Sequence, residues 1–327
     1  MLASPSSSAR GVVFAVIATL FWASNFITPY VTGEYGILDV LLVRYLFTGA
    51  LGLIGLLLYR ERLRQLGPRQ WLTGMALGVI GYLVYSASIA GSVIFGGPTL
   101  IAAFIGCVPV LQALLGNVHA QRVAWTRLAL PIGLLGIGLS LINLDLFTSP
   151  YAPADGVLAG IFAGLAILAW LSFSVINQNA VVDLAPRATA AWTCLMMVGA
   201  GLVAALLAPL ASAYDLLRWQ GAQWSTEGAL HLYGWAALIG VSSSLVGAAA
   251  WNIATRHLPM VLSGQLIALE SVFASLMGLA FVGRAPSALE TAGLLLVLAG
   301  TARAIHIILA PAHSGVAPTH RKGVSTK

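Results

Sequence analysis

The chain has 327 residues, of which 59% are hydrophobic and only 8% are charged. A water-facing protein surface needs roughly 25% charged residues, so this composition excludes the water-soluble enzyme classes. The 16 basic and 10 acidic residues are also bunched along the chain. Most of the uncharged runs between them reach or exceed the roughly 20 residues that cross a bilayer. The sequence therefore predicts an all-α, polytopic membrane protein.

Glycine, proline and charge clusters divide the apolar runs into ten predicted transmembrane helices. Turn signals such as Gly96-Gly97-Pro98 mark their ends. The predicted spans are 11–32, 37–59, 71–91, 98–118, 126–144, 156–178, 188–210, 231–255, 260–282 and 287–309. Residues 1–10 are predicted to be a short N-terminal tail without a removable signal peptide, and residues 310–327 a disordered C-terminal tail.

The placement of lysine and arginine predicts the orientation, because positively charged residues are retained on the cytoplasmic side. With the N-terminus inside, only Arg218 and Arg284 fall on the outer side, and Arg44 lies within a span. We therefore expect a multi-pass protein of the cell inner membrane with both termini in the cytoplasm. The chain has no soluble basic domain, so we do not expect nucleic acid as a partner.

The two halves of the sequence show a weak internal repeat. A shift of 162 residues aligns the third to fifth spans with the eighth to tenth, and a shift near 148 aligns the first two spans of each half. The aligned pairs include Gly78 with Gly240, Val110 with Val272, Arg122 with Arg284, and Trp22 with Trp170. Five spans per half, over residues 11–145 and 155–309, would make the halves inverted repeats. Such repeats place a cavity near the bilayer midplane and open it alternately to each side.

Four segments of the sequence are similar to a known family. They are Phe21-Trp22-Ala23-Ser24-Asn25-Phe26, Val43-Arg44-Tyr45-Leu46, Val108-Pro109-Val110 and Ala268-Leu269-Glu270-Ser271-Val272-Phe273-Ala274. These segments resemble the EamA-type proteins of the drug/metabolite transporter superfamily, over about residues 11–309. The resemblance implies two five-helix repeats and transport, with export as the expected direction. The family usually has a proline where Ser271 stands and an acid where Arg122 and Arg284 stand, so the chain resembles a divergent member.

The sequence places two charged residues at bilayer depth, and each requires an explanation because an ionisable group in lipid is costly. Arg44 is either a structural anchor or gate element, or a contact for a substrate carboxylate. Glu270 has three interpretations that the sequence leaves open. It is a protonated structural group, a proton-coupling site, or a binding site for a cationic substrate group such as an amine.

Aromatic and amide side chains inside the spans have the spacing of a cavity lining. Ser174 and Asn177 follow Trp170 at i+4 and i+7, which places them on one helix face. The alternative is helix packing with interhelical amide hydrogen bonds. The predicted substrate-binding residues are Trp22, Asn25, Arg44, Tyr82, Tyr85, Gln112, Trp170, Asn177, Trp251, Asn252 and Gln265, with Glu270 as the predicted proton-coupling residue.

These features predict a transporter rather than an enzyme. A phosphate-binding glycine loop with lysine is missing, and no histidine or cysteine has metal-ligand spacing, so we expect no cofactor and no metal. We predict export of a small metabolite or amino acid by alternating access, driven by the proton gradient or by the substrate gradient. Efflux of hydrophobic cations and metabolite uptake are the alternatives, and an integral-membrane enzyme ranks last. The expected partners are the substrate and the lipid bilayer, with a monomer or homodimer as the assembly.

Overall fold

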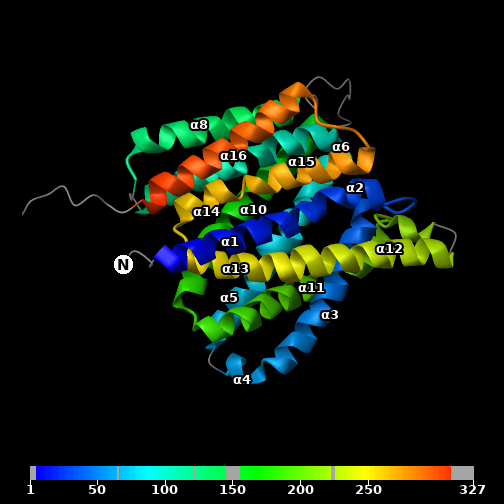
Figure 1. Ribbon diagram of the computed structural model, residues 1–327. Coiled ribbons are helices and arrows are strands. Elements are labelled where there is room, and N and C mark those ends of the chain that lie inside the picture. Colours follow the sequence, from blue (N-terminus) through cyan, green and yellow to red (C-terminus); the bar gives the residue numbers. More distant parts are fainter. Residues whose placement is uncertain (1–4, 65, 121–122, 145–154, 222–224, 311–327) are drawn as a thin grey trace, which may run out of the picture.

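The structure is a computed structural model, and it describes residues 5–64, 66–120, 123–144, 155–221 and 225–310 (Figure 1). Every regular element within these ranges is a helix, as the composition predicts. The first helix begins at Pro5, inside the segment predicted to be an N-terminal tail. Residues 311–327 of the predicted C-terminal tail lie outside the described residues.

The helices before residue 145 make up the first half of the chain. They are α1 (Pro5–Trp22), η1 (Ala23–Ile27), α2 (Thr28–Val31), α3 (Ile37–Leu58), α4 (Arg60–Leu63), α5 (Pro68–Gly78), η2 (Val79–Val84), α6 (Tyr85–Gly106), α7 (Val108–Ala120) and α8 (Trp125–Ile142). Within α6, Gly97 has a φ of 72° and a ψ of 174°, which breaks the helix. The break coincides with the turn predicted from Gly96-Gly97-Pro98.

The helices after residue 155 make up the second half. They are α10 (Gly156–Asp183), η3 (Pro186–Ala188), α11 (Thr189–Ala213), η4 (Arg218–Gln220), α12 (Thr226–Ile239), η5 (Gly240–Gly247), α13 (Ala248–His257), α14 (Met260–Leu266), α15 (Leu269–Val282) and α16 (Ala288–Leu309). Side-chain caps fix several of their starts, including those of α10 and α16. The Asp155 carboxylate accepts the N–H groups of Val157 and Leu158 at 3.0 Å, and Ser287 and Glu290 cap α16 reciprocally.

Nine helical stretches among the described residues are long and apolar enough to cross a membrane. They are Ser7–Ile27, Ile37–Leu58, Pro68–Gly97, Trp125–Ile142, Gly156–Asp183, Pro186–Ala213, Thr226–His257, Met260–Val282 and Ala288–Leu309. They correspond to nine of the ten predicted spans. The predicted fourth span, 98–118, falls on a shorter apolar stretch, Phe104–Val118.

Several spans are interrupted near their middles. The first passes from α1 into the 3₁₀ segment η1 directly after Trp22. The third and eighth spans contain the π-helical segments η2 and η5. Neither segment contains a proline that would explain the change from α-helical to π-helical geometry. A shift of 162 residues moves η2 onto positions 241–246, which lie inside η5. Because π-helical turns are rare and frequently occur at functional sites, these paired interruptions direct attention to the centre of the molecule.

The most extensive helix contacts join one half of the chain to the other. They pair α3 with α11, α8 with α16, α7 with α14, α1 with α13, and α6 with α10. Figure 1 shows α8 beside α16 at one edge of the molecule and α3 near α11 at the opposite edge, with α1 and α13 between them. The two halves are therefore packed into a single body through a long shared interface.

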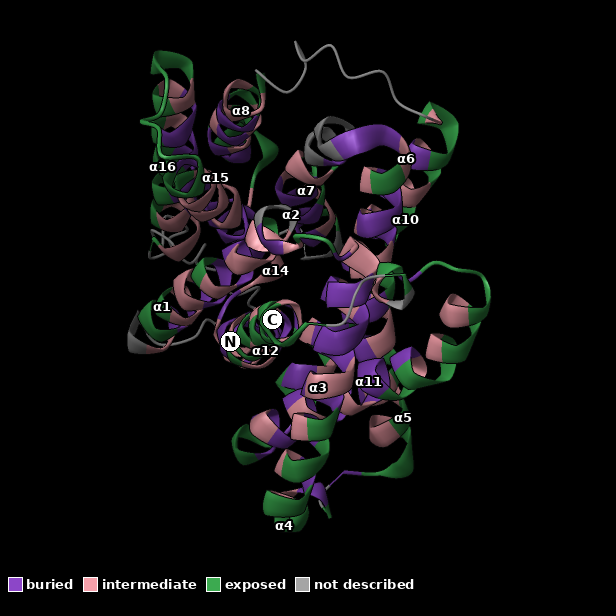
Figure 2. Cartoon of the chain, turned by 90° about the vertical axis from the view of Figure 1, so that its right-hand side faces the viewer, coloured by how far each residue is buried: buried purple, intermediate pink, exposed green. Residues whose placement is uncertain are grey.

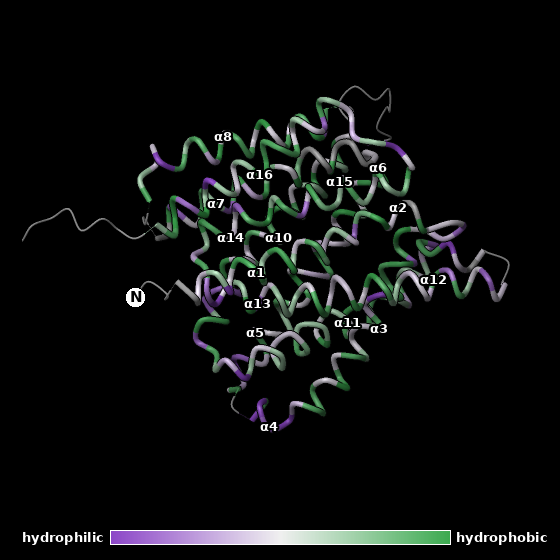
Figure 3. The backbone as a smooth tube through the Cα atoms, in the orientation of Figure 1, coloured by the Kyte–Doolittle hydropathy of each residue, from purple (hydrophilic) through white to green (hydrophobic). Residues whose placement is uncertain are grey.

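The outer surface of the helices is apolar. Leu57, Leu58, Leu72 and Val157 are each more than 70% exposed, and hydrophobic residues run along the full lengths of the helices in Figure 3, while α4 is hydrophilic. Buried residues face the interior on α3, α10 and α11 (Figure 2). A surface this apolar requires lipid rather than water around it, which makes the chain a multi-pass membrane protein.

Glycine residues let several helices touch backbone to backbone. A Cβ atom on Gly49 would lie 2.8 Å from the Cα atom of Gly201, where α3 crosses α11. At the crossing of α8 and α16, a Cβ atom on Gly138 would lie 2.8 Å from the carbonyl oxygen of Gly293. Small residues at such crossings allow the close approach that stabilises helix pairs in membranes.

Gly78 gives the most severe test of this packing. A methyl group at this position would overlap the backbone carbonyl of Met196 in α11, and backbone cannot move aside as a flexible side chain can. We expect Gly78→Ala to destabilise the protein by about 3 kcal/mol, since overpacking typically costs about 1–3 kcal/mol. The measurement is the melting temperature of the detergent-solubilised protein. Gly133→Ala is the matched control, because nothing lies within 4 Å of its added methyl group; equal melting temperatures for the two variants would refute this packing.

Candidate functional site

Three tryptophans from three spans meet at the centre of the molecule. Trp22 ends α1, Trp170 lies in α10 and Trp251 lies in α13, and each is less than 5% exposed. The ring centroid of Trp22 lies 5.2 Å from that of Trp170 and 5.1 Å from that of Trp251. Trp170 and Trp251 lie 6.4 Å apart. The sequence placed these residues inside spans far apart in the chain, and the fold brings them together.

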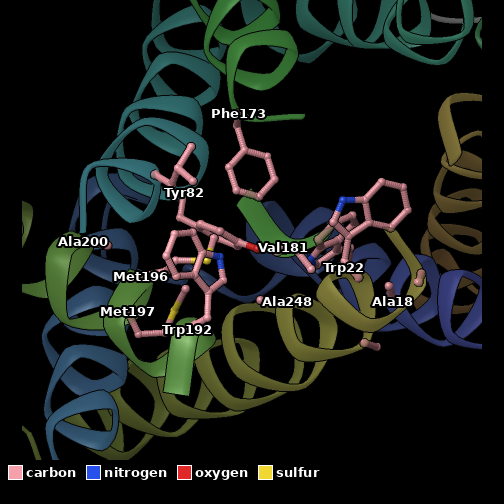
Figure 4. Close-up of a cluster of buried hydrophobic side chains, with 14 of the residues drawn as sticks. Ala18, Trp22, Tyr82, Phe173, Val181, Trp192, Met196, Met197, Ala200 and Ala248 are labelled. Atoms are coloured by element: carbon pink, nitrogen blue, oxygen red, sulfur yellow. The ribbon is translucent and has the colours of Figure 1, made fainter. Parts of the chain in front are cut away.

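Aromatic residues of η2, α6 and α10 extend this cluster. Tyr85 lies 5.2 Å from Trp170, Phe173 lies 5.3 Å from Trp170, and Tyr82 lies 5.5 Å from Phe173. Figure 4 shows Tyr82 and Phe173 close together near Trp22. Phe173 was not predicted as part of the site, although its i+3 spacing from Trp170 on one helix face is a signal that could have identified it.

The indole N–H groups of two of these tryptophans bind polar atoms from other spans. The Nε1–H of Trp22 donates to the backbone carbonyl of Ser243 in η5 at 3.1 Å. The Nε1–H of Trp170 donates to the Gln112 side-chain oxygen in α7 at 2.8 Å, and the Ser174 hydroxyl donates to the same oxygen at 3.3 Å. The rings are therefore fixed at their polar edges as well as packed on their faces, which gives the centre one defined arrangement.

A second polar network lies beside the cluster, between α10, α11 and α13. The Asn177 side-chain N–H donates to the Asn252 oxygen at 2.8 Å, and Asn252 in turn donates to the Thr193 hydroxyl at 2.9 Å. Trp192 donates its Nε1–H to the Asn177 oxygen at 3.0 Å. All of these side chains are buried. Trp192 was not among the predicted site residues, because its partner Asn177 lies on another helix.

Arg44 of α3 lies at the junction of η1 and η5. Its guanidinium group donates to Ser244 Oγ at 2.9 Å, to Asn25 Oδ1 at 2.7 Å and to Ser243 Oγ at 3.1 Å. The guanidinium carbon also lies 5.1 Å from the centre of the Tyr45 ring. The predicted residues Arg44 and Asn25 are thus in direct contact, and their serine partners come from the π-helical segment.

Glu270 is the second residue of α15, directly after the interruption that separates α14 from α15. It is half-buried, and its side chain makes no hydrogen bond or ion pair within the described residues. Its carboxyl group is close enough to Tyr85 for the two to interact electrostatically, and α15 packs against η1 and α1. Glu270 is therefore at the edge of the aromatic cluster, on the side of Asn25.

Gln265 is the predicted site residue least connected to the rest. Its side chain is fully buried in α14, where the amide nitrogen contacts the Val261 carbonyl at 3.4 Å. The amide oxygen is buried without a partner in the described residues. No hydrogen bond or ring contact joins Gln265 to the tryptophans, so the structure leaves its predicted role without direct support.

Asp39 is a buried acid that the sequence did not single out, because it begins a span near a loop. It is fully buried in the first turn of α3. One carboxylate oxygen accepts the backbone N–H groups of Gly36 at 2.7 Å and Arg218 at 3.1 Å. Asp39 therefore ties the loop before α12 to the start of α3, away from the aromatic cluster.

A surface hollow in the described part of the chain lies away from this centre. That hollow lies between α7 and α8 and is lined by Asn117, Val118, Val123, Ala124 and Trp125. None of the candidate site residues lines it, so we assign the site by the convergence of polar and aromatic side chains. Within the same ranges, no group of three or more histidine, cysteine, aspartate or glutamate side chains could hold a metal ion.

Comparison with known proteins finds a relative that is named as an inner membrane protein. The sequence is 28% identical over 305 residues to the protein named "Inner membrane protein YtfF" of Escherichia coli (strain K12), covering 90% of this chain and 94% of that one. The chain is related to an inner membrane protein. Its multiple apolar helices agree with a multi-pass location there. No family model matches the sequence.

The fold also has a counterpart among solved structures. A chain titled only "Crystal structure of protein" superimposes with a TM-score of 0.70, over 90% of this chain and 96% of that chain. The two sequences are 17% identical. This likeness concerns the fold alone.

Proposed function

We propose that the chain is a carrier of the inner membrane that moves a small metabolite or amino acid by alternating access, with export as the direction. The paired interruption of spans in the two halves carries this proposal. The π-helical segments η2 and η5 occupy positions related by the same shift of 162 residues that aligns the sequence halves. Interrupted helices at the interface of repeats are typical of substrate sites in secondary transporters.

The helix pairing supports two inverted five-helix repeats over residues 11–145 and 155–309. Exchanging the halves converts the pair of α1 and α13 into the pair of α10 and α6, and both pairs are present. It converts the pairs of α3 with α11 and of α8 with α16 into themselves. This pattern is the one expected from a pseudo-two-fold axis, and ten spans with both termini in the cytoplasm complete the proposal. The start of α1 and the end of α16 lie on the same side in Figure 1.

The segments that resemble EamA-type proteins support membership of the drug/metabolite transporter superfamily. One contributes Trp22 and Asn25, another contributes Arg44 and Tyr45, and a third contributes Glu270. All of these residues belong to the central cluster or contact it. The residues that carry the resemblance therefore also form the candidate site, whereas scattered packing positions would be expected of a chance match.

In this proposal the chemistry of each central side chain determines its role in transport. The tryptophans offer flat apolar surfaces, the amides of Asn25, Gln112, Asn177 and Asn252 offer hydrogen bonds, and Glu270 couples transport to proton movement. Glu270 suits this role because it is an acid at the centre without a cationic partner in the described ranges. Such a carboxyl group can exchange a proton without breaking an ion pair. No enzymatic step and no cofactor is part of the proposal.

A second candidate is the efflux of hydrophobic cations. One observation favours it, since the half-buried Glu270 is within electrostatic range of Tyr85, whose ring contacts Trp170. An unpaired acid next to aromatic faces is suited to a cation with an apolar body.

The deciding experiment is transport by the purified chain in liposomes. A panel of labelled amino acids, organic acids and cationic dyes is tested for exchange against internal unlabelled solute, with and without a pH gradient. We expect saturable exchange of at least one class. Transport of dyes alone would favour the second candidate, and the absence of exchange for every solute, with correctly folded protein, would refute the carrier proposal.

A further inference from the structure

Arg44 is a buried cation without an acidic partner among the described residues. It is 5% exposed, and the ion pairs in the described ranges lie elsewhere, joining Glu61 to its neighbouring arginines and Arg284 to Glu290. Removing a charge from water costs several kcal/mol unless well-placed partners offset it. Here the hydrogen-bond partners of the guanidinium group are neutral oxygens, so the site retains a net positive charge.

The donors of Arg44 are only partly used. A guanidinium group has five N–H groups. Ser244, Asn25 and Ser243 accept one each, from Nε, Nη1 and Nη2 respectively. One N–H group on each terminal nitrogen therefore remains without an acceptor in the described residues. Two N–H groups in one plane match the two oxygens of a carboxylate.

The surroundings of Arg44 favour an anion with an apolar body. The hydroxyl groups of Ser243 and Ser244 accept from Arg44, and their own hydrogens are not donated to any described residue. The Ser243 carbonyl also binds Trp22, so the guanidinium group and the tryptophan cluster are held by the same residue. Among the described residues, Glu270 of α15 forms no ion pair with Arg44.

Arg44 is held between the two interrupted segments, η1 and η5. Asn25 of η1 and Ser242 of η5 are half-buried, unlike Arg44 itself. Ser24 and Ser242 lie 3.0 Å apart through their hydroxyl oxygens and join the two segments. Separation of η1 from η5 would break this contact and the bond between Arg44 and Asn25, which would expose further N–H groups to an entering anion.

We propose that Arg44, Ser243 and Ser244 form an anion subsite that binds the carboxylate of a substrate whose apolar body lies against Trp22 and Trp251. The inference rests on the proposed carrier function and narrows its substrate class to carboxylates. The carboxylate supplies the counter-charge that the described residues do not, while the π-helical segment supplies the hydroxyl donors. Arg44 thereby selects the sign of the substrate charge.

A purely structural role for Arg44 makes a different prediction, and Arg256 is the matched control. Arg256 donates to the carbonyl oxygens of Val181 and Leu184 at 2.7 Å each, and so closes the C-terminal end of α10. It lies outside the central cluster. Loss of either arginine is expected to lower the melting temperature, but only loss of Arg44 should remove carboxylate binding.

The test measures ligand-induced thermal stabilisation of the purified full-length protein in detergent. The probes are phenylacetate, indole-3-acetate and 4-methylpentanoate, each compared with its uncharged primary amide and its amine. We expect saturable stabilisation by at least one acid and none by its amide. In Arg44→Gln the apparent affinity for that acid should fall at least about tenfold, the minimum for loss of a charge-assisted hydrogen bond. In Arg44→Lys the loss should be partial, and Arg256→Gln should retain the affinity.

Two outcomes would overturn the proposal. One is that none of the acids stabilises the protein, or that the amides do so equally well. The other is that Arg44→Gln binds the acids as the natural chain does. Transport is measured separately in liposomes. Exchange of cations without acid binding would support the carrier function and refute the anion subsite. Arg44-dependent acid binding without exchange of any solute would support the anion subsite and refute the carrier function.

Discussion

Glu270→Gln is expected to abolish substrate accumulation driven by a pH gradient while preserving exchange at equal pH on both sides. The carboxyl group of Glu270 has no ion-pair partner within the described residues, so it can gain and lose a proton during the cycle. Glutamine keeps the size and hydrogen-bonding capacity of the protonated form but cannot release the proton. Coupling one proton to one uncharged substrate supports up to about tenfold accumulation per pH unit, because one unit corresponds to 1.36 kcal/mol.

The measurement is uptake into proteoliposomes with an imposed pH gradient, beside counterflow without one. Glu227→Gln is the control, because Glu227 is an exposed acid in the first turn of α12. Gradient-driven accumulation by Glu270→Gln at the level of the natural chain would rule out coupling at this residue. If the variant instead loses affinity for amines alone, Glu270 binds the substrate; if only its melting temperature falls, Glu270 is structural.

Trp170→Ala is expected to have the second large effect, on stability and on substrate affinity together. Trp170 contacts Trp22, Tyr85, Phe173 and Trp251, so its removal leaves a large cavity at the centre. Replacing a buried aromatic residue by alanine typically costs about 3–5 kcal/mol. It also removes the indole N–H group that donates a hydrogen bond to the Gln112 side-chain oxygen. The readouts are the melting temperature and the half-saturating concentration for exchange.

Trp170→Phe separates the two effects in part, because it keeps a smaller aromatic ring in place while removing the indole N–H and the five-membered ring that carries it. We expect a smaller loss of stability and an altered substrate affinity. Trp125→Phe serves as the control, since Trp125 is half-exposed at the start of α8. Trp170 would have only a packing role if two results were found together. The Trp170→Phe protein would fold and keep its affinity for every substrate, and the Trp170→Ala protein would differ only by a lower melting temperature.

The sequence predicts the architecture well where the signal is local. Apolar runs bounded by turn residues located the helices, and Gly96-Gly97-Pro98 marked a real break because Gly97 adopts a positive φ. The π-helical segments could not be predicted in the same way. The residues of η5, Gly240–Gly247, contain neither proline nor a charge. Their geometry is set by contacts with α1 and α3, which a local pattern does not encode.

For the candidate site, the sequence predicted which residues matter but not which residues they contact. The cost of burying a charge was enough to single out Arg44 and Glu270. The partners of Arg44 were beyond prediction, because Ser243 and Ser244 lie about 200 residues further along the chain. The contact between Trp170 and Gln112 likewise depends on how α7 and α10 meet. Asp39 was overlooked because burial at a helix start depends on the loop that covers it, here through Arg218.

The glycine crossings at the two edges of the molecule constrain how its centre can move. At Gly49 with Gly201, and at Gly138 with Gly293, one backbone rests directly on another. Such crossings can tilt with little repacking, whereas the interleaved tryptophans between them must separate before a substrate can pass. The edge pairs α3 with α11 and α8 with α16 lie on opposite sides of the central cluster (Figure 1). If the protein is a carrier that works by rocking, the helices would tilt at these two crossings while Trp22, Trp170 and Trp251 separate between them.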